Sequence, residues 1–488
     1  MIYPRSLLAL LPVAWIWLSP SPVPAPSAPP PPLTTRGTSP ASSGANLRPR
    51  MAPALPQTPE GKRLAAFLAA AEAGTESAVR AFIVENFPAS ALAETPVEPR
   101  LKRILGLITR SGPFDLLEAL PTRSDPASMR VRSRKTGGTL EVSLELEEGA
   151  GRGVLGVDLE EVADSSADDA PKKNDAELAA AVDAAVSALA SRDAFSGVVL
   201  LARQGEPFFE KAWGVADRDT AVPNRVDTKF NIGSIGKAFT RAAVMDLVHS
   251  GRLSLEDTVH KHLPEARIPS SDRMTVSQLL EMTSGLGDVF GQKYEATPKE
   301  RLKTLSDFLP FFEGEKLKFE PGQGRAYSNA GYVVLGLIVE KISRRSYWDF
   351  VRERIFSPAG MTDTGPFGPN EVIANRAIGY TKTPEGTWRA NTFALPARAS
   401  SAGGVHSTTR DLLRFVRAVG DGRVLQRPTP STADAPQLGI AGGTVGANAA
   451  VEARPDGLIV IVLANLDPPA AEKLVQRIRK WTPPKPGP

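Results

Sequence analysis

The stretch KFNIGSIGKAFT, residues 229–240, decides the fold of this chain. It places Ser234 and Lys237 three residues apart, where a glycine-broken segment turns into one with helical periodicity. Side chains at positions i and i+3 lie on one face of a helix, so this hydroxyl and this amine can meet. The pair has three interpretations: chance, a phosphate-binding loop, or a serine that a lysine makes nucleophilic.

Two familiar motifs fail at this stretch. A phosphate-binding loop requires G-x-x-x-x-G-K-[ST], but Asn231 occupies its first glycine position and Ala238 follows the lysine. A nucleophile elbow, G-x-S-x-G, fails because Ile232 stands where its first glycine belongs. A Ser-His-Asp triad would draw on only four histidines, and none of them lies in a suggestive context.

A lysine-activated serine remains. The helical pattern runs on to Gly251, a residue typical of a helix C-terminus, so Ser234 falls in the first turn. The positive end of the helix dipole stabilises an alkoxide that forms there. A buried lysine loses proton affinity and can accept or relay the serine proton. Taken alone, the pair also fits a solvated lysine on an ordinary helix.

Composition narrows the possible classes of function. The chain has 488 residues, of which 42% are hydrophobic and 23% charged, as expected for a globular protein of two or three domains. The net charge of +4 is spread along the chain, and the densest basic run, residues 130–135, has no aromatic neighbours for stacking. We therefore predict no nucleic-acid partner.

Metal and thiol chemistry have little support in the sequence. The chain contains no cysteine, which excludes disulfides, thiolate nucleophiles and iron–sulfur clusters. The histidines are His249, His260, His262 and His406. The alternating pair at 260 and 262 has no third ligand nearby, so we predict neither a metal site nor a cofactor.

Changes in composition divide the chain into five segments. One positive charge and an apolar run over residues 7–18 indicate a signal peptide or an uncleaved anchor. They predict an exported protein, periplasmic or extracellular, that contacts a membrane only through this segment; Met51 is an alternative start. The predicted segments are a signal or anchor (1–28), a Pro/Ser-rich linker (29–57), a small α+β accessory domain (58–162), a polar linker (163–176) and a larger α+β domain (177–483).

Both domains have a readable element order. In residues 58–162, three helical patterns precede four strand-like pieces, an order that resembles the cone-shaped nuclear-transport-factor-like fold. In residues 177–483, a helix and two strands open the domain, and strands and a helix close it. We expect one antiparallel sheet built from both ends of that segment, flanked by helices, with an all-helical region between them.

A second motif follows at residues 327–329. Tyr327-Ser328-Asn329 lies in a loop before a strongly apolar helix. The tyrosine can share proton transfer with Lys237, and we expect its cationic neighbour to lower its pKa. The asparagine can orient a substrate amide.

The order of these motifs resembles the serine β-lactamase and penicillin-binding family, on the branch of class C β-lactamases, D-aminopeptidases and esterases. Ser234-x-x-Lys237 precedes Tyr327-x-Asn329, as in that family. The resemblance spans residues 177–481 and includes the segments HSGRLSLEDTVHKHLPE, MTVSQLLEMTSGL, ERIFSPAGMTDTG and SAGGVHSTTRDLLRFV.

The resemblance implies a set of roles. Ser234 attacks a carbonyl and becomes acylated, Lys237 and Tyr327 act together as the base, and Asn329 helps to hold the substrate. The backbone N–H groups of Ser234 and Gly443 form the oxyanion hole, in which one donor contributes roughly 3 kcal/mol. The implied activity is that of a serine hydrolase.

The third motif of the family departs from its pattern here. The family has Lys or His, a small residue and glycine, whereas this chain has Ile440, Ala441 and Gly442. The lost cation would have attracted a substrate carboxylate, so we expect a neutral ester or amide substrate rather than a β-lactam. The alternative is a weakly active or inactive relative that serves as a binding or sensing module. The Pro-rich connection 424–437 predicts a trimmed substrate wall; substrate identity and oligomeric state stay open.

Overall fold

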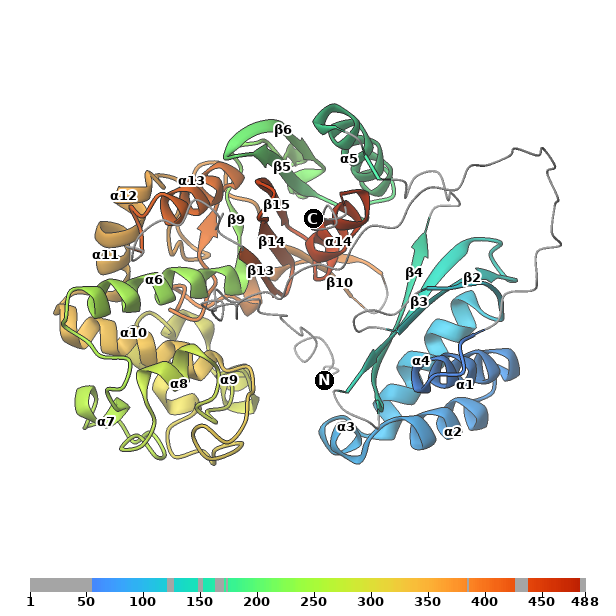
Figure 1. The fold of residues 1–488 in the computed structure, drawn as a ribbon, viewed down its shortest axis with the longest axis horizontal. Coiled ribbons are helices and arrows are strands. Elements are labelled where there is room, and N and C mark those ends of the chain that lie inside the picture. Colours follow the sequence, from blue (N-terminus) through green and yellow to red (C-terminus); the bar gives the residue numbers. More distant parts are fainter. Residues whose placement is uncertain are drawn as a thin grey trace, which may run out of the picture. The chain divides into compact units, whose positions relative to one another are not determined.

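The computed structural model describes residues 55–120, 127–147, 152–162, 171–172, 174–383, 386–425 and 438–482. They form two compact units, one within residues 55–162 and the other within 171–482 (Figure 1). The predicted signal or anchor, nearly all of the first linker and most of the connection 424–437 lie outside the described residues. Among the helices of the described ranges, none is long and apolar enough to cross a membrane.

The smaller unit is a helical layer against a four-stranded antiparallel sheet in the order β1-β2-β3-β4. Its helices are α1 (Pro59–Ala73), α2 (Glu76–Asn86), α3 (Ala89–Glu94) and α4 (Val97–Ser111), and its strands are β1 (Phe114–Ala119), β2 (Ala127–Ser133), β3 (Thr139–Leu146) and β4 (Val154–Val162). Thr58 and Thr75 cap α1 and α2 with their side chains. The short helix α3 is additional to the three helices that the pattern predicts, because six residues are too few for a clear period.

The larger unit is built on a five-stranded antiparallel sheet in the order β13-β14-β15-β5-β6. Its strands are β5 (Gly197–Arg203), β6 (Glu206–Trp213), β13 (Leu438–Thr444), β14 (Ala447–Ala453) and β15 (Leu458–Ala464). The last strand pairs with the first along its whole length, from Leu458 opposite Arg203 to Ala464 opposite Gly197. The predicted sheet made from both ends of the segment is therefore confirmed.

Helices cover both faces of this sheet (Figure 1). Helices α5 (Asp175–Ala190) and α14 (Ala470–Trp481) share a core cluster with one face. Helices α6 (Gly236–His249), α10 (Asn329–Ser343) and α13 (Thr409–Gly420) share a core cluster with the other face. Phe239 of α6 makes edge-to-face contacts with the rings of Phe356 and Phe415, which locks α6 against its neighbours.

The shorter elements lie between these layers or at their edges. The short helices are α7 (Val259–His262), α8 (Val276–Leu280), α9 (Gln292–Ala296), α11 (Tyr347–Val351) and α12 (Ser357–Ala359). The short strands are β7 (Val215–Asp217), β8 (Val222–Pro223), β9 (Phe230–Asn231), β10 (Tyr380–Lys382), β11 (Trp388–Ala390) and β12 (His406–Ser407). Strand β9, which leads into the deciding stretch, pairs with β12 and so joins two segments that are about 175 residues apart.

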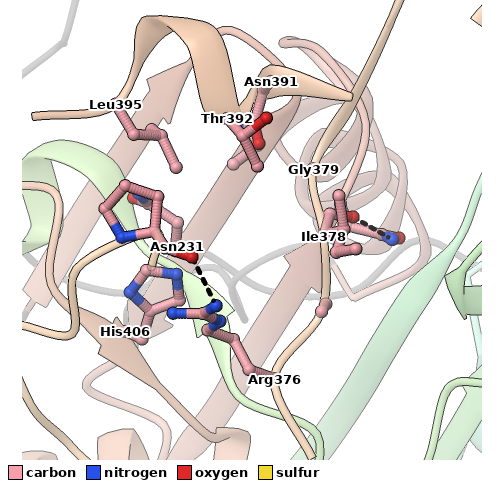
Figure 2. Close-up of a pocket in the computed structure, with 12 residues that line it drawn as sticks. Asn231, Arg376, Ile378, Gly379, Asn391, Thr392, Leu395 and His406 are labelled. Carbon is pink, nitrogen blue, oxygen red and sulfur yellow. Dashed lines mark hydrogen bonds between the residues drawn. The ribbon is translucent and has the colours of Figure 1, made fainter. Parts of the chain in front are cut away.

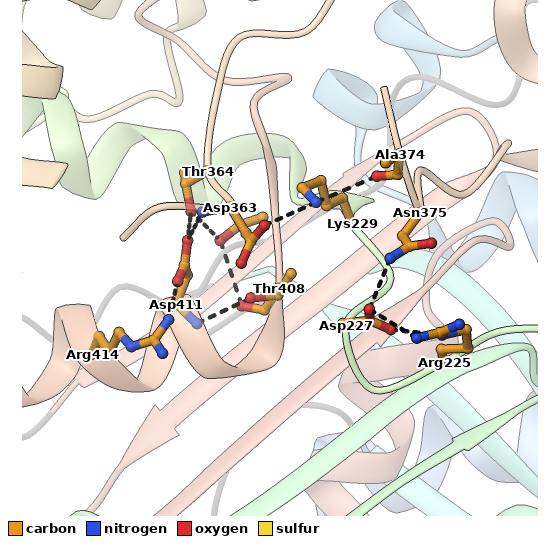
Figure 3. Close-up of polar contacts among 11 residues, drawn as sticks. Arg225, Asp227, Lys229, Asp363, Thr364, Ala374, Asn375, Thr408, Asp411 and Arg414 are labelled. Atoms are coloured by element: carbon orange, nitrogen blue, oxygen red, sulfur yellow. Dashed lines mark hydrogen bonds and ion pairs between the residues drawn. The ribbon is translucent and has the colours of Figure 1, made fainter. Parts of the chain in front are cut away.

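A buried carboxylate fixes one side of this arrangement. Asp411 in the first turn of α13 is fully buried and accepts hydrogen bonds from the Asp363 N–H (2.8 Å) and the Thr364 hydroxyl (2.7 Å) (Figure 3). Arg414 donates to it at 2.6 Å from a half-exposed position. Asp363 in turn pairs with Lys229, the first residue of the deciding stretch, at 2.9 Å. One carboxylate therefore links α13 to the segment that supports Lys229.

We predict that Asp411→Ala lowers the free energy of unfolding by about 3 kcal/mol, because it removes a fully buried carboxylate that accepts from the Asp363 N–H and the Thr364 hydroxyl. Arg414→Ala serves as the control, since its guanidinium is half exposed and should contribute about 1 kcal/mol or less. Urea denaturation of both variants measures the difference. Equal losses in the two variants would contradict the role given to Asp411.

Candidate active site

The serine of the deciding stretch lies in a tight turn before a helix. Ser234 is the middle residue of the 3-10 turn Gly233–Ile235, and α6 follows directly. Gly233 has φ +50°, a left-handed conformation that other residues seldom adopt. Its N–H donates to Asn231 Oδ1 at 2.9 Å, and this hydrogen bond stabilises the turn. The serine backbone thus lies at the positive end of α6, as the sequence predicts.

Lys237 lies one turn further along and is fully buried. Its Nζ donates to Asn329 Oδ1 and to the Ala402 carbonyl, both at 2.6 Å, and lies 3.2 Å from Ser234 Oγ. Burial lowers the pKa of Lys237 to about 7, and the negative charge of Asp288 opposes that shift. Near neutral pH a large fraction of this lysine is therefore an uncharged amine beside the serine hydroxyl.

Tyr327 completes the contact around the serine. Its hydroxyl lies 2.6 Å from Ser234 Oγ, and Lys237 Nζ lies 4.7 Å from the centre of its ring. Burial raises the pKa of Tyr327, with a further contribution from the charge of Asp288, and the hydrogen bond with Ser234 opposes the rise. The expectation of a lowered pKa is wrong, because desolvation of the phenolate is the largest influence on this pKa and outweighs the hydrogen bond with Ser234, which lowers it.

Asn329 is the first residue of α10, whose N-terminus Ser328 caps by accepting the Gly331 N–H. Asn329 presents Oδ1 to Lys237, while its Nδ2 donates to Asp288 at 2.8 and 3.1 Å. The amide hydrogens thus point at a carboxylate of this chain. The substrate-holding role of Asn329 stays a prediction, which this contact does not favour.

Strand β13 packs against the serine turn backbone to backbone. A Cβ atom at Gly442 would lie 2.3 Å from the Ile232 carbonyl and 2.6 Å from the Ser234 N. A Cβ atom at Gly233 would lie 2.5 Å from the Gly443 N. Any residue with a Cβ atom would overlap these backbone atoms, so only glycine permits the approach. The backbone N–H groups of Ser234 and Gly443, the two predicted oxyanion donors, both lie at this contact. Their catalytic role stays a prediction.

Ile440 and Ala441, the other residues of the third motif, pack against apolar clusters. Ile440 is 6% exposed and packs in the same core cluster as α6. Ala441 packs against the cluster on the opposite face of the sheet. An isoleucine at this position therefore fills an apolar site and offers no charge to a substrate.

A small cavity lies beside Asn231, whose side chain accepts the Gly233 N–H. Its volume is about 30 Å³, and Asn231, Arg376 and His406 are among the residues that line it (Figure 2). Burial and the charge of Arg376 lower the pKa of His406 to about 3, so that histidine is neutral at physiological pH. Such a volume holds water rather than a substrate. In the described ranges, no group of three or more His, Asp or Glu side chains could hold a metal ion.

Sequence reasoning missed two contacts of the site. Asp288 lies in the loop between α8 and α9, and no spacing rule relates it to the motifs. The Ala402 carbonyl belongs to a segment that packs on the serine turn, where the Gly404 N–H donates to the Gly233 carbonyl at 3.2 Å. The family resemblance includes the segment SAGGVHS, which contains Ala402. The sequence does not predict that the backbone carbonyl of Ala402 accepts a hydrogen bond from Lys237, because every residue has such a carbonyl.

Known proteins that are similar to this chain match its larger unit. The family model described as Beta-lactamase matches residues 182–460. Penicillin-binding protein 4* of Bacillus subtilis is 30% identical over 265 residues, which are 51% of this chain and 57% of that protein. The chain therefore spans little more than half the length of this relative.

Solved structures share the fold of the larger unit. A penicillin-binding protein from Bacillus halodurans is 28% identical with a TM-score of 0.55, covering 60% of this chain and 98% of that one. D-amino acid amidase from Ochrobactrum anthropi, solved with L-phenylalanine amide, is 24% identical with a TM-score of 0.52, covering 62% and 98%. At that lower identity the likeness concerns the fold alone.

We predict that Gly442→Ala abolishes covalent labelling of the serine and lowers the free energy of unfolding by about 2 kcal/mol, because the new methyl group would overlap backbone atoms of the serine turn. Gly439→Ala in the same strand is the matched control, since a Cβ atom there meets nothing within 4 Å. Labelling with a fluorophosphonate and urea denaturation measure the two effects. A Gly442→Ala protein that behaves like the control would refute the close packing.

Proposed function

The chain belongs to the beta-lactamase family, and we propose that it is a serine hydrolase that forms an acyl-enzyme on Ser234. The observation that carries the proposal is the convergence of three groups: the Ser234 hydroxyl lies 2.6 Å from Tyr327 OH and 3.2 Å from Lys237 Nζ. A nucleophile with two proton-transfer groups in contact is the arrangement that acyl transfer requires.

Lys237 supplies the base in this proposal. In its neutral form the amine donates its two N–H groups to Asn329 Oδ1 and the Ala402 carbonyl, so its lone pair is left for the serine proton. Tyr327, whose raised pKa keeps it a phenol, passes a proton between the serine and the leaving group. The proton therefore moves along a chain of groups that are already in contact.

The reaction proceeds in two halves. Ser234 Oγ bonds to the substrate carbonyl carbon while its proton passes to Lys237, and the oxyanion accepts hydrogen bonds from the N–H groups of Ser234 and Gly443. The carbonyl carbon then loses its amine or alcohol, which leaves with the proton. Water attacks the acyl-enzyme by the same route, the acid departs, and the hydroxyl of Ser234 is restored.

The substrate is proposed to be a neutral ester or amide. Where the family has a cation that attracts a carboxylate, this chain has the buried Ile440, so the carboxylate of a penicillin or a D-alanyl peptide would find no partner at this position. The amidase name of the Ochrobactrum structure is in keeping with amide cleavage, although that protein shares only the fold. The apolar N-terminal run supports an exported enzyme.

The missing cation also favours a second candidate function, a binding or sensing module that is acylated without turnover. Intact mass after treatment with a fluorophosphonate and with p-nitrophenyl esters separates the two. We expect the wild-type protein to gain one fluorophosphonate adduct, Ser234→Ala to gain none, and p-nitrophenyl acetate to be turned over faster than a chromogenic cephalosporin. A lasting acyl adduct would identify the sensor, and no adduct at all would overturn both functions.

We predict that kcat/KM for the ester rises with pH to a plateau with a midpoint near 7. Below that pH Lys237 is protonated and has no lone pair for the serine proton, whereas above it the amine is neutral. Steady-state rates between pH 5 and 9 measure this rise of kcat/KM and its midpoint. A rate that does not vary across this range, or that falls as the pH rises through 7, would contradict the assignment of the base.

A further inference from the structure

We propose that Asp288 is a positioning residue: it fixes the side-chain amide of Asn329 and thereby directs the lone pair of Lys237 toward Ser234. The inference rests on the proposed function and adds to it a group outside the motifs. Asp288 reaches the site from the loop between α8 and α9, and it contacts Asn329 rather than the serine.

The first step is the orientation of the amide. Asn329 lies between a donor, Lys237 Nζ, and an acceptor, the Asp288 carboxylate. A side-chain amide has one end that accepts and one end that donates, so only one of its two orientations satisfies both neighbours. The reverse orientation would set the amide oxygen against the Asp288 carboxylate, which is repulsive, and would turn the NH2 group toward Lys237 Nζ.

The second step is the hydrogen-bond count at the lysine. A neutral amine has two N–H groups and one lone pair. The Asn329 oxygen and the Ala402 carbonyl, each at 2.6 Å, accept both N–H groups, so the lone pair faces the third neighbour, Ser234 Oγ. If Asn329 turned its NH2 group toward the lysine, that group would compete for the lone pair. The amide orientation therefore decides whether Lys237 can act as a base.

The third step is the rigidity of Asp288 itself. Its Oδ1 accepts the Phe290 N–H at 3.3 Å, and the preceding carbonyl of Gly287 accepts the Ser328 hydroxyl at 2.8 Å. Ser328 is the residue that caps α10, directly before Asn329. The loop and the helix end are thus held together at adjacent residues, which keeps the carboxylate opposite the amide although Asp288 is exposed to solvent.

The charge of Asp288 has a separate, smaller effect. The groups that face Lys237 are the Asp288 carboxylate and the rings of Tyr327 and Tyr332, at 4.7 and 5.5 Å from Nζ. Both tyrosines are neutral phenols because burial raises their pKa values. In the part of the chain that the structure describes, this carboxylate is the negative charge that raises the pKa of Lys237, so its removal should lower that pKa.

Two substitutions separate position from charge. Asp288→Asn keeps an oxygen that can accept from Asn329 but removes the charge, whereas Asp288→Ala removes both. We expect Asp288→Ala to slow fluorophosphonate labelling of Ser234 at least tenfold, as for loss of an effective base. We expect Asp288→Asn to keep most of the wild-type labelling rate. In this variant the rise of the labelling rate with pH should have its midpoint at a lower pH than in the wild type. Asp272→Ala, at an exposed position on the same unit, controls for net charge.

A double-mutant cycle tests whether Asp288 acts through Asn329. In an Asn329→Ala background, Asp288→Ala should slow labelling by less than twofold, because the amide that it orients is already gone. A full tenfold loss in that background, equal losses in Asp288→Asn and Asp288→Ala, or a wild-type rate in Asp288→Ala would each overturn the inference. Failure of the wild-type protein to be labelled would instead overturn the proposed function, and the inference with it.

Discussion

The burial of one amine governs the chemistry proposed for this molecule. Lys237 is fully enclosed, and its Nζ is held by two oxygen acceptors at 2.6 Å with the serine hydroxyl beside it. A charged lysine is costly to bury, and here a neutral amine serves as well because both acceptors suit its two N–H groups. The same desolvation keeps Tyr327 protonated. The site thus holds a nucleophile, an amine that can act as a base and a phenol that can act as an acid.

The topology of the larger unit brings segments that are distant in sequence into contact with the Lys237 amine. The serine turn, the start of α10 and the 402–404 segment each contribute a partner, although they are about 70 to 170 residues apart in the chain. Strand β13, which follows all three of these segments in the chain, packs against the turn through Gly442. Because sheet, helices and turn share one core cluster, a change of packing at any of them would move the amine.

Much of this could be predicted from the sequence, for reasons that differ between residues. Ser234 and Lys237 follow from local helix spacing, and the sheet built from both ends follows from hydrophobic runs whose strand pairing the structure confirms. The direction of the Tyr327 pKa was predicted wrongly, because pair charges can be read from a sequence whereas desolvation requires the packed structure. Asp288 was not predictable, since a loop carboxylate becomes part of the site only through the tertiary position of Asn329.

The protonation of Lys237 tests this account most directly. Lysine labelled with 13C at Cε reports its own titration by NMR, and the Lys237 signal can be assigned as the one missing from Lys237→Arg. The account predicts a midpoint near 7, far below the ordinary value of 10.5. A midpoint at or above 10 would mean that the amine is charged at neutral pH, and it would contradict the assignment of Lys237 as the base.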